Sequence, residues 1–211
     1  MYQGAPSHSG WVERGVAIGR GEDDHWWEWH ITGTPCHGGD DEALAHVFWV
    51  GRVGEGRLGL MPHPLGDGLL ASEIRALRED GVDRVVSLLT AYEARRFGLA
   101  DEASACVADG IAFDSFPIED RNVPAQLAPT IDFLKDLVAR LHRGESVALH
   151  CRVGVGRSGL MTAGCLVMTG VPPEEAIAQV AEARRLPIPD TSAQRDWILD
   201  LAGIWKTRHA F

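Results

Sequence analysis

The sequence predicts an α/β fold with a mostly parallel central sheet flanked by helices. From residue 46 onward, short apolar and β-branched runs alternate with segments that have the spacing of amphipathic helices. Such alternation is typical of a sheet that helices cover on both faces. Apolar residues make up 45% of the 211 residues and charged residues 24%, which excludes global disorder and provides material for one sizeable core.

The expected strands and helices are bounded by recognisable start and stop signals. Gly81 and Gly110 end two of the helices, and Thr90 with Glu93 forms a capping box that opens a third. The predicted strands lie at 46–50, 57–61, 82–89, 111–118 and 146–151. The predicted helices lie at 69–80, 91–97, 102–109, 127–143, 158–169, 172–185 and 192–206. The sequence therefore predicts one domain over residues 46–211.

Residues 1–45 differ in composition and are expected to form an N-terminal extension. Gly, His and Trp dominate there, and 12–18 and 26–31 are strand-like around a turn-rich stretch, which predicts a β-hairpin flap. Its potential metal ligands do not have the CxxC or HxxxH spacing of common zinc sites. They are His25, His30, Cys36 and His37. We expect an aromatic-rich flap that packs on the domain, and no metal.

Charge and cysteine usage narrow the classes of function and location. Thirty acidic against twenty basic residues give a formal net charge of −10, which argues against a broad nucleic-acid-binding face. The longest uncharged stretch, 159–173, is too short and too interrupted for a membrane span. The N-terminus lacks the basic and apolar parts of a secretory signal, so we expect a cytoplasmic protein with free thiols.

The segment HCRVGVGRSG, between a predicted strand and a helix, carries the most specific pattern. Its glycines spell GxGxxG, but the position about 20 residues later, where a dinucleotide site needs an acidic strand end, holds Glu174 and Glu175 at a helix start. Its spacing also approaches that of a nucleotide P-loop, yet Cys151 and Arg157 replace the glycine and the lysine that cradle phosphates there. The remaining interpretation is Cys-x5-Arg-Ser.

A cysteine at the start of such a loop is suited to attack a bound phosphoryl group. Successive backbone N–H groups at a helix N-terminus form an anion cradle, and they also favour the thiolate of Cys151. Arg157 can hold two phosphoryl oxygens with its planar fork, Ser158 can donate to the sulfur, and His150 can fix the loop by hydrogen bonding to the backbone. The expected phosphate-binding residues are Arg152, Val153, Gly154, Val155, Gly156 and Ser158.

A general acid is also required, on a neighbouring loop, to protonate the departing oxygen. The predicted strand 111–118 runs into the proline-flanked loop 116–124, which offers Glu119 and Asp120. Spacing alone does not choose between these two carboxylates. Asp114 lies inside the strand, where we expect a structural role.

The loop HCRVGVGRSG resembles the signature of the cysteine-dependent protein tyrosine phosphatase superfamily, and FPIEDRNVP resembles the general-acid loop of its dual-specificity-like branch. The order of elements over about 46–206 is similar to that of kinase-associated phosphatases and their bacterial relatives. The resemblance implies that Cys151 attacks a phosphomonoester and forms a phosphocysteine, and that Asp120 rather than Glu119 is the acid. It implies neither a metal nor another cofactor.

The same resemblance directs attention to residues around the loop. Gln194 lies in a stretch that places a glutamine near the active site in related enzymes, where it can orient water, although a surface helix position is an equal alternative. Arg121 and Arg152 are expected on a local basic rim, whereas Arg184 and Arg185 are interpreted as solvated charge.

The expected function is the dephosphorylation of phosphoproteins at phosphotyrosine, in a shallow site that also tolerates phosphoserine or phosphothreonine. Lipid phosphatases of this superfamily carry basic residues at the first and fourth variable loop positions, which here are Arg152 and Val155, so a phosphoinositide or another small phosphate ester is the second choice. A non-catalytic phosphopeptide-binding module is less favoured, because the cysteine, arginine and aspartate are all present. Arsenate reduction would need a resolving thiol, and Cys165, expected in the core, is the candidate.

Overall fold

The computed structural model describes residues 45–208, so the predicted N-terminal hairpin and its histidines lie outside the described residues. The strands are β1 (Phe48–Val53), β2 (Gly56–Pro62), β3 (Arg84–Ser87), β4 (Ala112–Ser115) and β5 (Val147–Cys151). The helices are η1 (Asp67–Leu69), α2 (Leu70–Glu79), α3 (Ala91–Arg96), α4 (Glu102–Ala108), α5 (Leu127–His142), α6 (Arg157–Met168), α7 (Pro173–Arg184) and α8 (Ser192–Arg208). Every strand and helix predicted within 46–206 has a counterpart.

The five strands form one sheet in the order β1-β2-β5-β3-β4. Only β1 is antiparallel to its neighbour, and the other pairs are parallel, which confirms the predicted α/β class. The central strand β5 is hydrogen-bonded on both sides: its Leu149 pairs with Leu60 of β2 and with Val86 of β3. Because ligands of open parallel sheets bind beyond the carboxyl ends of the strands, this arrangement directs attention to the end of β5.

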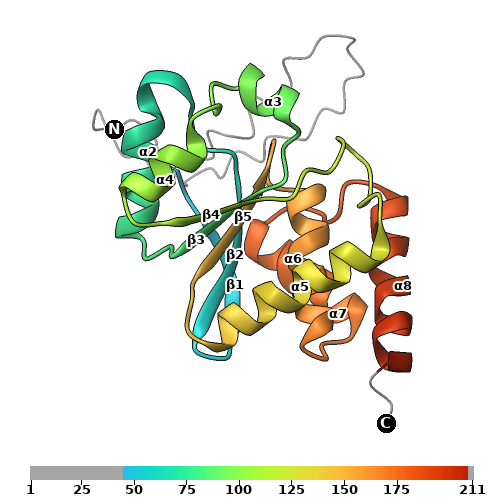
Figure 1. Ribbon diagram of the computed structural model, residues 1–211. Coiled ribbons are helices and arrows are strands. Elements are labelled where there is room, and N and C mark those ends of the chain that lie inside the picture. The colour runs from blue at the N-terminus through green and yellow to red at the C-terminus, as the bar shows by residue number, and fades with distance from the viewer. Residues whose placement is uncertain (1–44, 209–211) are drawn as a thin grey trace, which may run out of the picture.

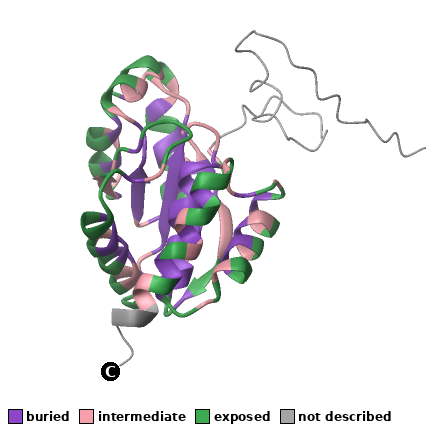
Figure 2. Ribbon diagram, turned by 90° about the vertical axis from the view of Figure 1, so that its right-hand side faces the viewer, coloured by how far each residue is buried: buried purple, intermediate pink, exposed green. Residues whose placement is uncertain are grey.

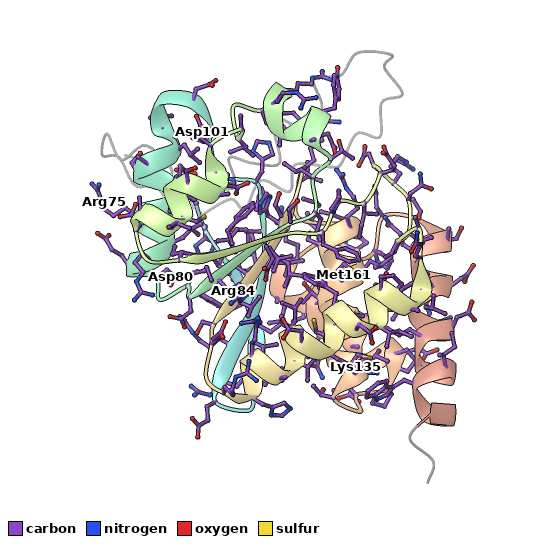
Figure 3. All side chains as sticks on the ribbon, viewed as in Figure 1. Arg75, Asp80, Arg84, Asp101, Lys135 and Met161 are labelled. Atoms are coloured by element: carbon purple, nitrogen blue, oxygen red, sulfur yellow. The ribbon has the colours of Figure 1, made fainter. Side chains whose placement is uncertain are left out.

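Helices cover both faces of the sheet, as Figure 1 shows. Helices α2 and α4 lie on one face, where labelled Arg75 and Asp101 are found in Figure 3, and α5 with labelled Lys135 lies on the other together with α6, α7 and α8. Helix α6 is buried along its whole length, because the sheet, α5, α7 and α8 surround it (Figure 2). Apart from Arg157, Ser158 and Thr162, its residues are apolar or glycine, as such a buried position requires.

Strands β3 and β4 are shorter than predicted because the chain leaves the sheet before the apolar runs end. Leu88 and Ile118 follow the two strands and stay buried. The N–H of Leu88 donates to the carbonyl of His150 at 2.9 Å, and the N–H of Ile118 donates to the carbonyl of Leu88 at 3.1 Å. These extensions bring the loops after β3 and β4 beside the end of β5. Short helix α3 lies at the same end of the sheet (Figure 1).

Candidate active site

The Cys-x5-Arg segment forms the loop between the central strand and helix α6. Strand β5 ends at Cys151 and α6 begins at Arg157. Gly154 has a φ of +69°, and a Cβ atom there would come within 2.6 Å of the Met61 backbone, so the turn requires glycine. Cys151 is 3% exposed, and its Sγ lies 3.3 Å from the hydroxyl oxygen of Ser158. The expected partnership of this hydroxyl with the sulfur is thus geometrically present.

Arg157 is buried and is fixed by a glutamate from another part of the chain. Its Nη1 and Nη2 donate to the two carboxylate oxygens of Glu93, each at 2.8 Å, and Nη1 also donates to the carbonyl of Ile118 at 2.9 Å. The predicted capping box is confirmed, with the N–H and hydroxyl of Thr90 both 2.9 Å from Glu93 Oε2. Burial by itself raises the pKa of Glu93, but the bonds from Arg157 and Thr90 outweigh it and lower the pKa.

Of the two predicted acid candidates, Asp120 is the one whose carboxylate contacts Arg157. Its Oδ1 is 3.1 Å from Nη2 of Arg157, and its side chain is about half exposed. Glu119 is exposed, and its carbonyl accepts from the N–H of Asn122 at 3.0 Å within the same loop. The side chain of Asp114, in β4, pairs with Arg84 at 2.7 Å, as its predicted structural role requires. The geometry thus favours Asp120 as the group that reaches a substrate at Cys151.

A pocket of about 470 Å³ opens over the cysteine. Arg121 and Arg152 both line it, at the rim position predicted for them, and Arg121 lies 3.8 Å from Asp190. The pocket combines cationic and apolar walls around the sulfur. Its lining consists of Asp120, Arg121, Cys151, Arg152, Val153, Val155, Gly156, Arg157, Arg184, Leu186, Pro187, Pro189 and Asp190.

The interpretation of Arg184 as solvated charge is wrong. Its side chain is 6% exposed, with Nε donating to the carbonyl of Gly154 at 3.0 Å and Nη2 donating to the carbonyl of Val153 at 3.1 Å. The guanidinium carbon lies 4.2 Å from the centre of the Phe48 ring, within range of a cation–π contact. Arg185 is exposed, as expected. Arg184, which also lines the pocket, therefore fixes the backbone of the cysteine loop through two of its carbonyls.

Gln194 is also buried, so of the two alternatives for this residue the surface helix position is wrong. Its Nε2 donates to the carbonyl of Asn122 at 3.0 Å, and its Oε1 accepts from the N–H of Thr191 at 3.3 Å. A Cβ atom on Gly156 would approach the same amide within 3.2 Å. Gln194 thus links α8, the Asp120 loop and the cysteine loop. Its action on a water molecule stays a prediction.

Helical spacing could have identified both residues. Arg184 follows Ile177 and Val180 at intervals that put all three on the buried face of α7, and Gln194 precedes buried Ile198 by one helical turn. A charged or amide group on an apolar face needs a buried partner. The sequence interpretation followed motifs and did not use this signal, a polar side chain on the apolar face of a helix.

The prediction that His150 bonds to the loop backbone is wrong. Its side chain is fully buried, and its Nε2 lies 2.9 Å from the carboxylate of Glu102. The sequence interpretation did not assign Glu102 any role. The carboxylate of α4 thus contacts the residue that precedes the nucleophile.

The remaining cysteines of residues 45–208 have the properties of core thiols. Burial raises the pKa of Cys165 to about 12, and burial together with Glu102 and Asp109 raises the pKa of Cys106 to about 12. Cys165 is fully buried, as predicted. Residues 45–208 contain no group of three metal-ligating side chains and no helix long and apolar enough to cross a membrane.

Fold and site together define the class of cysteine-dependent phosphatases. The nucleophile position lies at the end of the central strand, the arginine begins the next helix and the carboxylate comes from a neighbouring loop. The model of the Tc-R-P family, described as "Polymorphic toxin system, DSP-PTPase phosphatase", matches residues 61–171, more than half of the chain. The chain belongs to this family.

Individual relatives agree with this assignment. "Putative tyrosine phosphatase 197R" of Invertebrate iridescent virus 6 is 37% identical over 93 residues, which are 42% of this chain and 34% of that protein. The chain thus matches about a third of the length of this curated relative. Crystallised kinase associated phosphatase shares the fold at a TM-score of 0.69 and 20% identity, over 78% of this chain and 98% of that one. The structure of PTPMT1 in complex with PI(5)P is similar at a TM-score of 0.62 and 21% sequence identity, over 79% of this chain and 99% of that one.

Proposed function

We propose that this chain hydrolyses phosphomonoesters of phosphoproteins through a phosphocysteine intermediate. The observation that carries the proposal is the arrangement at one pocket of a buried Cys151 with a hydroxyl 3.3 Å from its sulfur, an immobilised Arg157 and the Asp120 carboxylate. These are a nucleophile, a bidentate phosphate ligand and a general acid within reach of one another.

In the first step the Cys151 thiolate attacks phosphorus, the S–P bond forms and the ester P–O bond breaks. The backbone N–H groups of the loop and the Arg157 fork bind the equatorial oxygens, whose charge they offset. Protonated Asp120 transfers its proton to the departing oxygen, so an alcohol or phenol leaves. The salt link between Asp120 and Arg157 must open as the phosphoryl group takes its place on the guanidinium.

In the second step water attacks phosphorus and the S–P bond breaks. Asp120, now a carboxylate, accepts a proton from this water, and inorganic phosphate is released. The Ser158 hydroxyl can donate to the leaving sulfur from 3.3 Å, which favours the thiolate as leaving group. Gln194, adjacent to the Asp120 loop, is the proposed group for orienting the water.

A phosphoinositide or another small phosphate ester is the second candidate substrate. The favouring observation is the cationic rim of the pocket, where Arg121 and Arg152 offer contacts to a second phosphate. The solved PTPMT1 in complex with PI(5)P shows such a ligand in a protein of the same fold. Val155 instead of a basic residue at the fourth variable position favours the phosphoprotein assignment.

The proposal is tested with a panel of phosphopeptides, phosphoinositides and nucleotides compared by kcat/KM, with Cys151→Ser as the matched inactive variant. We expect phosphotyrosine peptides to be the best substrates, with phosphoserine and phosphothreonine peptides next. Cys151→Ser should lose turnover and still bind the phosphopeptide, because the cradle and Arg157 remain. Higher kcat/KM on phosphoinositides would transfer the assignment to the second candidate, and turnover by the serine variant would refute the covalent mechanism.

We place this activity in the cytoplasm, because a thiolate nucleophile needs a reducing compartment. The formal net charge of −10 disfavours nucleic acid as a partner. The expected partner is the phosphorylated substrate itself.

A further inference from the structure

The pocket over Cys151 contains a carboxylate that neither step of the proposed reaction uses. Asp190 lies in the segment between α7 and α8, and its side chain, 41% exposed, lines this pocket. Its Oδ2 is 3.8 Å from Nη1 of Arg121. A Cβ atom on Gly156 would come within 3.0 Å of the Asp190 Cβ, so Asp190 also packs against the cysteine loop. A fixed negative charge in the wall of a phosphate-binding pocket repels an anionic ligand, so its presence needs a reason.

The partner of this carboxylate, Arg121, occupies a backbone position that usually holds glycine. The N–H of Asn122 donates to the carbonyl of Glu119 at 3.0 Å and closes a turn with Asp120 and Arg121 at its centre. Arg121 has a φ of +59°, and a left-handed residue at the third position of a turn is normally Gly or Asn. Side chains kept in such strained backbone concentrate at functional sites. The backbone thus points to a role for the arginine side chain, which lines the pocket as well.

The turn is anchored on both sides, so Arg121 presents its side chain from a constant position. Before the turn, the N–H of Ile118 donates to the carbonyl of Leu88 at 3.1 Å, and after it Nε2 of Gln194 donates to the carbonyl of Asn122 at 3.0 Å. The side chain of Arg121 is 65% exposed. Because ion pairs between exposed side chains are weak, an anionic group of a substrate can compete with Asp190 for this guanidinium.

The other cations of the pocket show which part of a substrate this competition concerns. Arg157 binds the phosphoryl group in the proposed reaction, and the guanidinium of Arg184 donates to carbonyls of the cysteine loop. Arg121 and Arg152 therefore remain for parts of the substrate outside the phosphoryl group. Asp190 pairs with one of these two, which offsets half of the positive charge that the rim offers to a second anion.

We propose that Asp190 is a specificity-determining residue, whose carboxylate pairs with Arg121 and disfavours substrates that carry a second anionic group beside the phosphoryl group. Such groups are the carboxylates of Asp or Glu next to a phosphorylated residue and the additional phosphates of a phosphoinositide. The substrates that remain favoured are phosphoprotein segments with neutral or basic flanking residues. This inference rests on the proposed function and deepens it, because it selects among phosphoproteins.

The first test compares the binding of inorganic phosphate and pyrophosphate by calorimetry, in chains that carry Cys151→Ser to prevent turnover. Asparagine has nearly the shape of aspartate, so Asp190→Asn removes the charge and keeps the packing against Gly156. We expect the ratio of the phosphate to the pyrophosphate dissociation constant to rise about fivefold. A ratio that stays unchanged or falls would overturn the proposal.

The matched control for this test is Glu119→Gln. Glu119 is an exposed carboxylate next to Asp120, and it is not among the described residues that line the pocket. Its replacement removes the same charge from the same end of the molecule and should leave the ratio unchanged. An equal rise in this variant would mean that net charge alone is responsible, and the proposal would fail.

A double variant tests whether Asp190 acts through Arg121. The backbone at position 121 favours glycine, so Arg121→Gly removes the side chain without a conformational penalty. In that background only the direct repulsion by Asp190 remains, and Asp190→Asn should raise the ratio by no more than about twofold. A full fivefold rise there would refute the role of the pair.

The second test measures kcat/KM on two phosphotyrosine peptides that differ only in Asp and Glu against Asn and Gln beside the phosphotyrosine. Asp190→Asn should raise the value for the acidic peptide about fivefold relative to the neutral one. Calorimetry requires no turnover, so the expected binding shift in a chain that hydrolyses neither peptide would refute the proposed function alone. Active enzyme whose preference Asp190→Asn leaves unchanged would refute this inference alone.

Discussion

Replacing Arg184 with methionine should weaken both the fold and the reaction. The variant loses two hydrogen bonds from a charged donor to the carbonyls of Gly154 and Val153, at 3.0 and 3.1 Å, while the unbranched side chain still packs near Phe48. Each such bond is worth about 1.5–3 kcal/mol, so the free energy of unfolding should fall by about 3 kcal/mol or more. For a domain of this size, that loss lowers Tm by about 6–12 °C.

The catalytic effect follows from the position of the two carbonyls. They belong to the peptide units whose N–H groups line the phosphate cradle, so releasing them lets the cradle shift. A displacement on the order of 1 Å at a reacting centre can cost about 10²-fold in rate, and we expect kcat/KM on an aryl phosphate to fall by that factor. Arg184→Lys should fall between wild type and methionine, because one ammonium cannot serve both acceptors with the geometry of the fork.

Arg185→Met is the matched control for this prediction. Arg185 is the next residue and is exposed, so its replacement should change stability by less than about 0.5 kcal/mol. Thermal unfolding and steady-state kinetics on the three variants provide the comparison. If Arg184→Met kept both the wild-type Tm and kcat/KM within threefold, the support of the loop by Arg184 would be refuted.

Four further variants test the other parts of the site. Asp120→Asn should slow alkyl phosphates by roughly 10²–10⁴-fold and an activated nitrophenyl ester much less, whereas Glu119→Gln should change neither; the opposite pattern in steady-state rates would assign the acid to the other residue. Because the pKa of Glu93 is lowered on folding, its ion pair with Arg157 stabilises the fold above the unfolded pKa and is lost as pH falls through the folded one. The Tm difference between wild type and Glu93→Gln should therefore shrink between about pH 6 and about pH 3, and a constant difference would contradict the ion pair. Gln194→Ala should reduce kcat on alkyl phosphates by about tenfold or more through misplacement of the acid loop, and unchanged kinetics would leave it a purely structural role.

Local patterns sufficed to predict most of the fold. Glycine stops, the capping box and apolar spacing each depend on residues within about one helical turn, and the corresponding helices and strands are present. The Cys-x5-Arg loop belongs to the same category, because its strand, loop and helix are contiguous. The roles of Cys151 and Arg157 could be proposed for that reason, whereas only the family resemblance chose Asp120 over Glu119 as the acid.

Contacts between distant parts of the chain could not be predicted in this way. The sequence identified Glu93 as half of a capping box. Its hydrogen bonds with Arg157 join residues that are 64 positions apart in the sequence. The partners of Arg184 lie 30 and 31 positions earlier, and those of Gln194 up to 72. Tertiary packing decides such pairs, and helical spacing indicates only that a buried partner must exist.

The immobilisation of Arg157 has a consequence for affinity. A free arginine side chain loses roughly 2 kcal/mol of rotamer entropy when a ligand orders it. Glu93 and the Ile118 carbonyl already hold this guanidinium before any substrate arrives, so most of that cost is met when the chain folds. The phosphoryl group then binds a guanidinium that is already ordered. A saving of roughly 2 kcal/mol in binding free energy corresponds to a dissociation constant that is roughly thirtyfold lower.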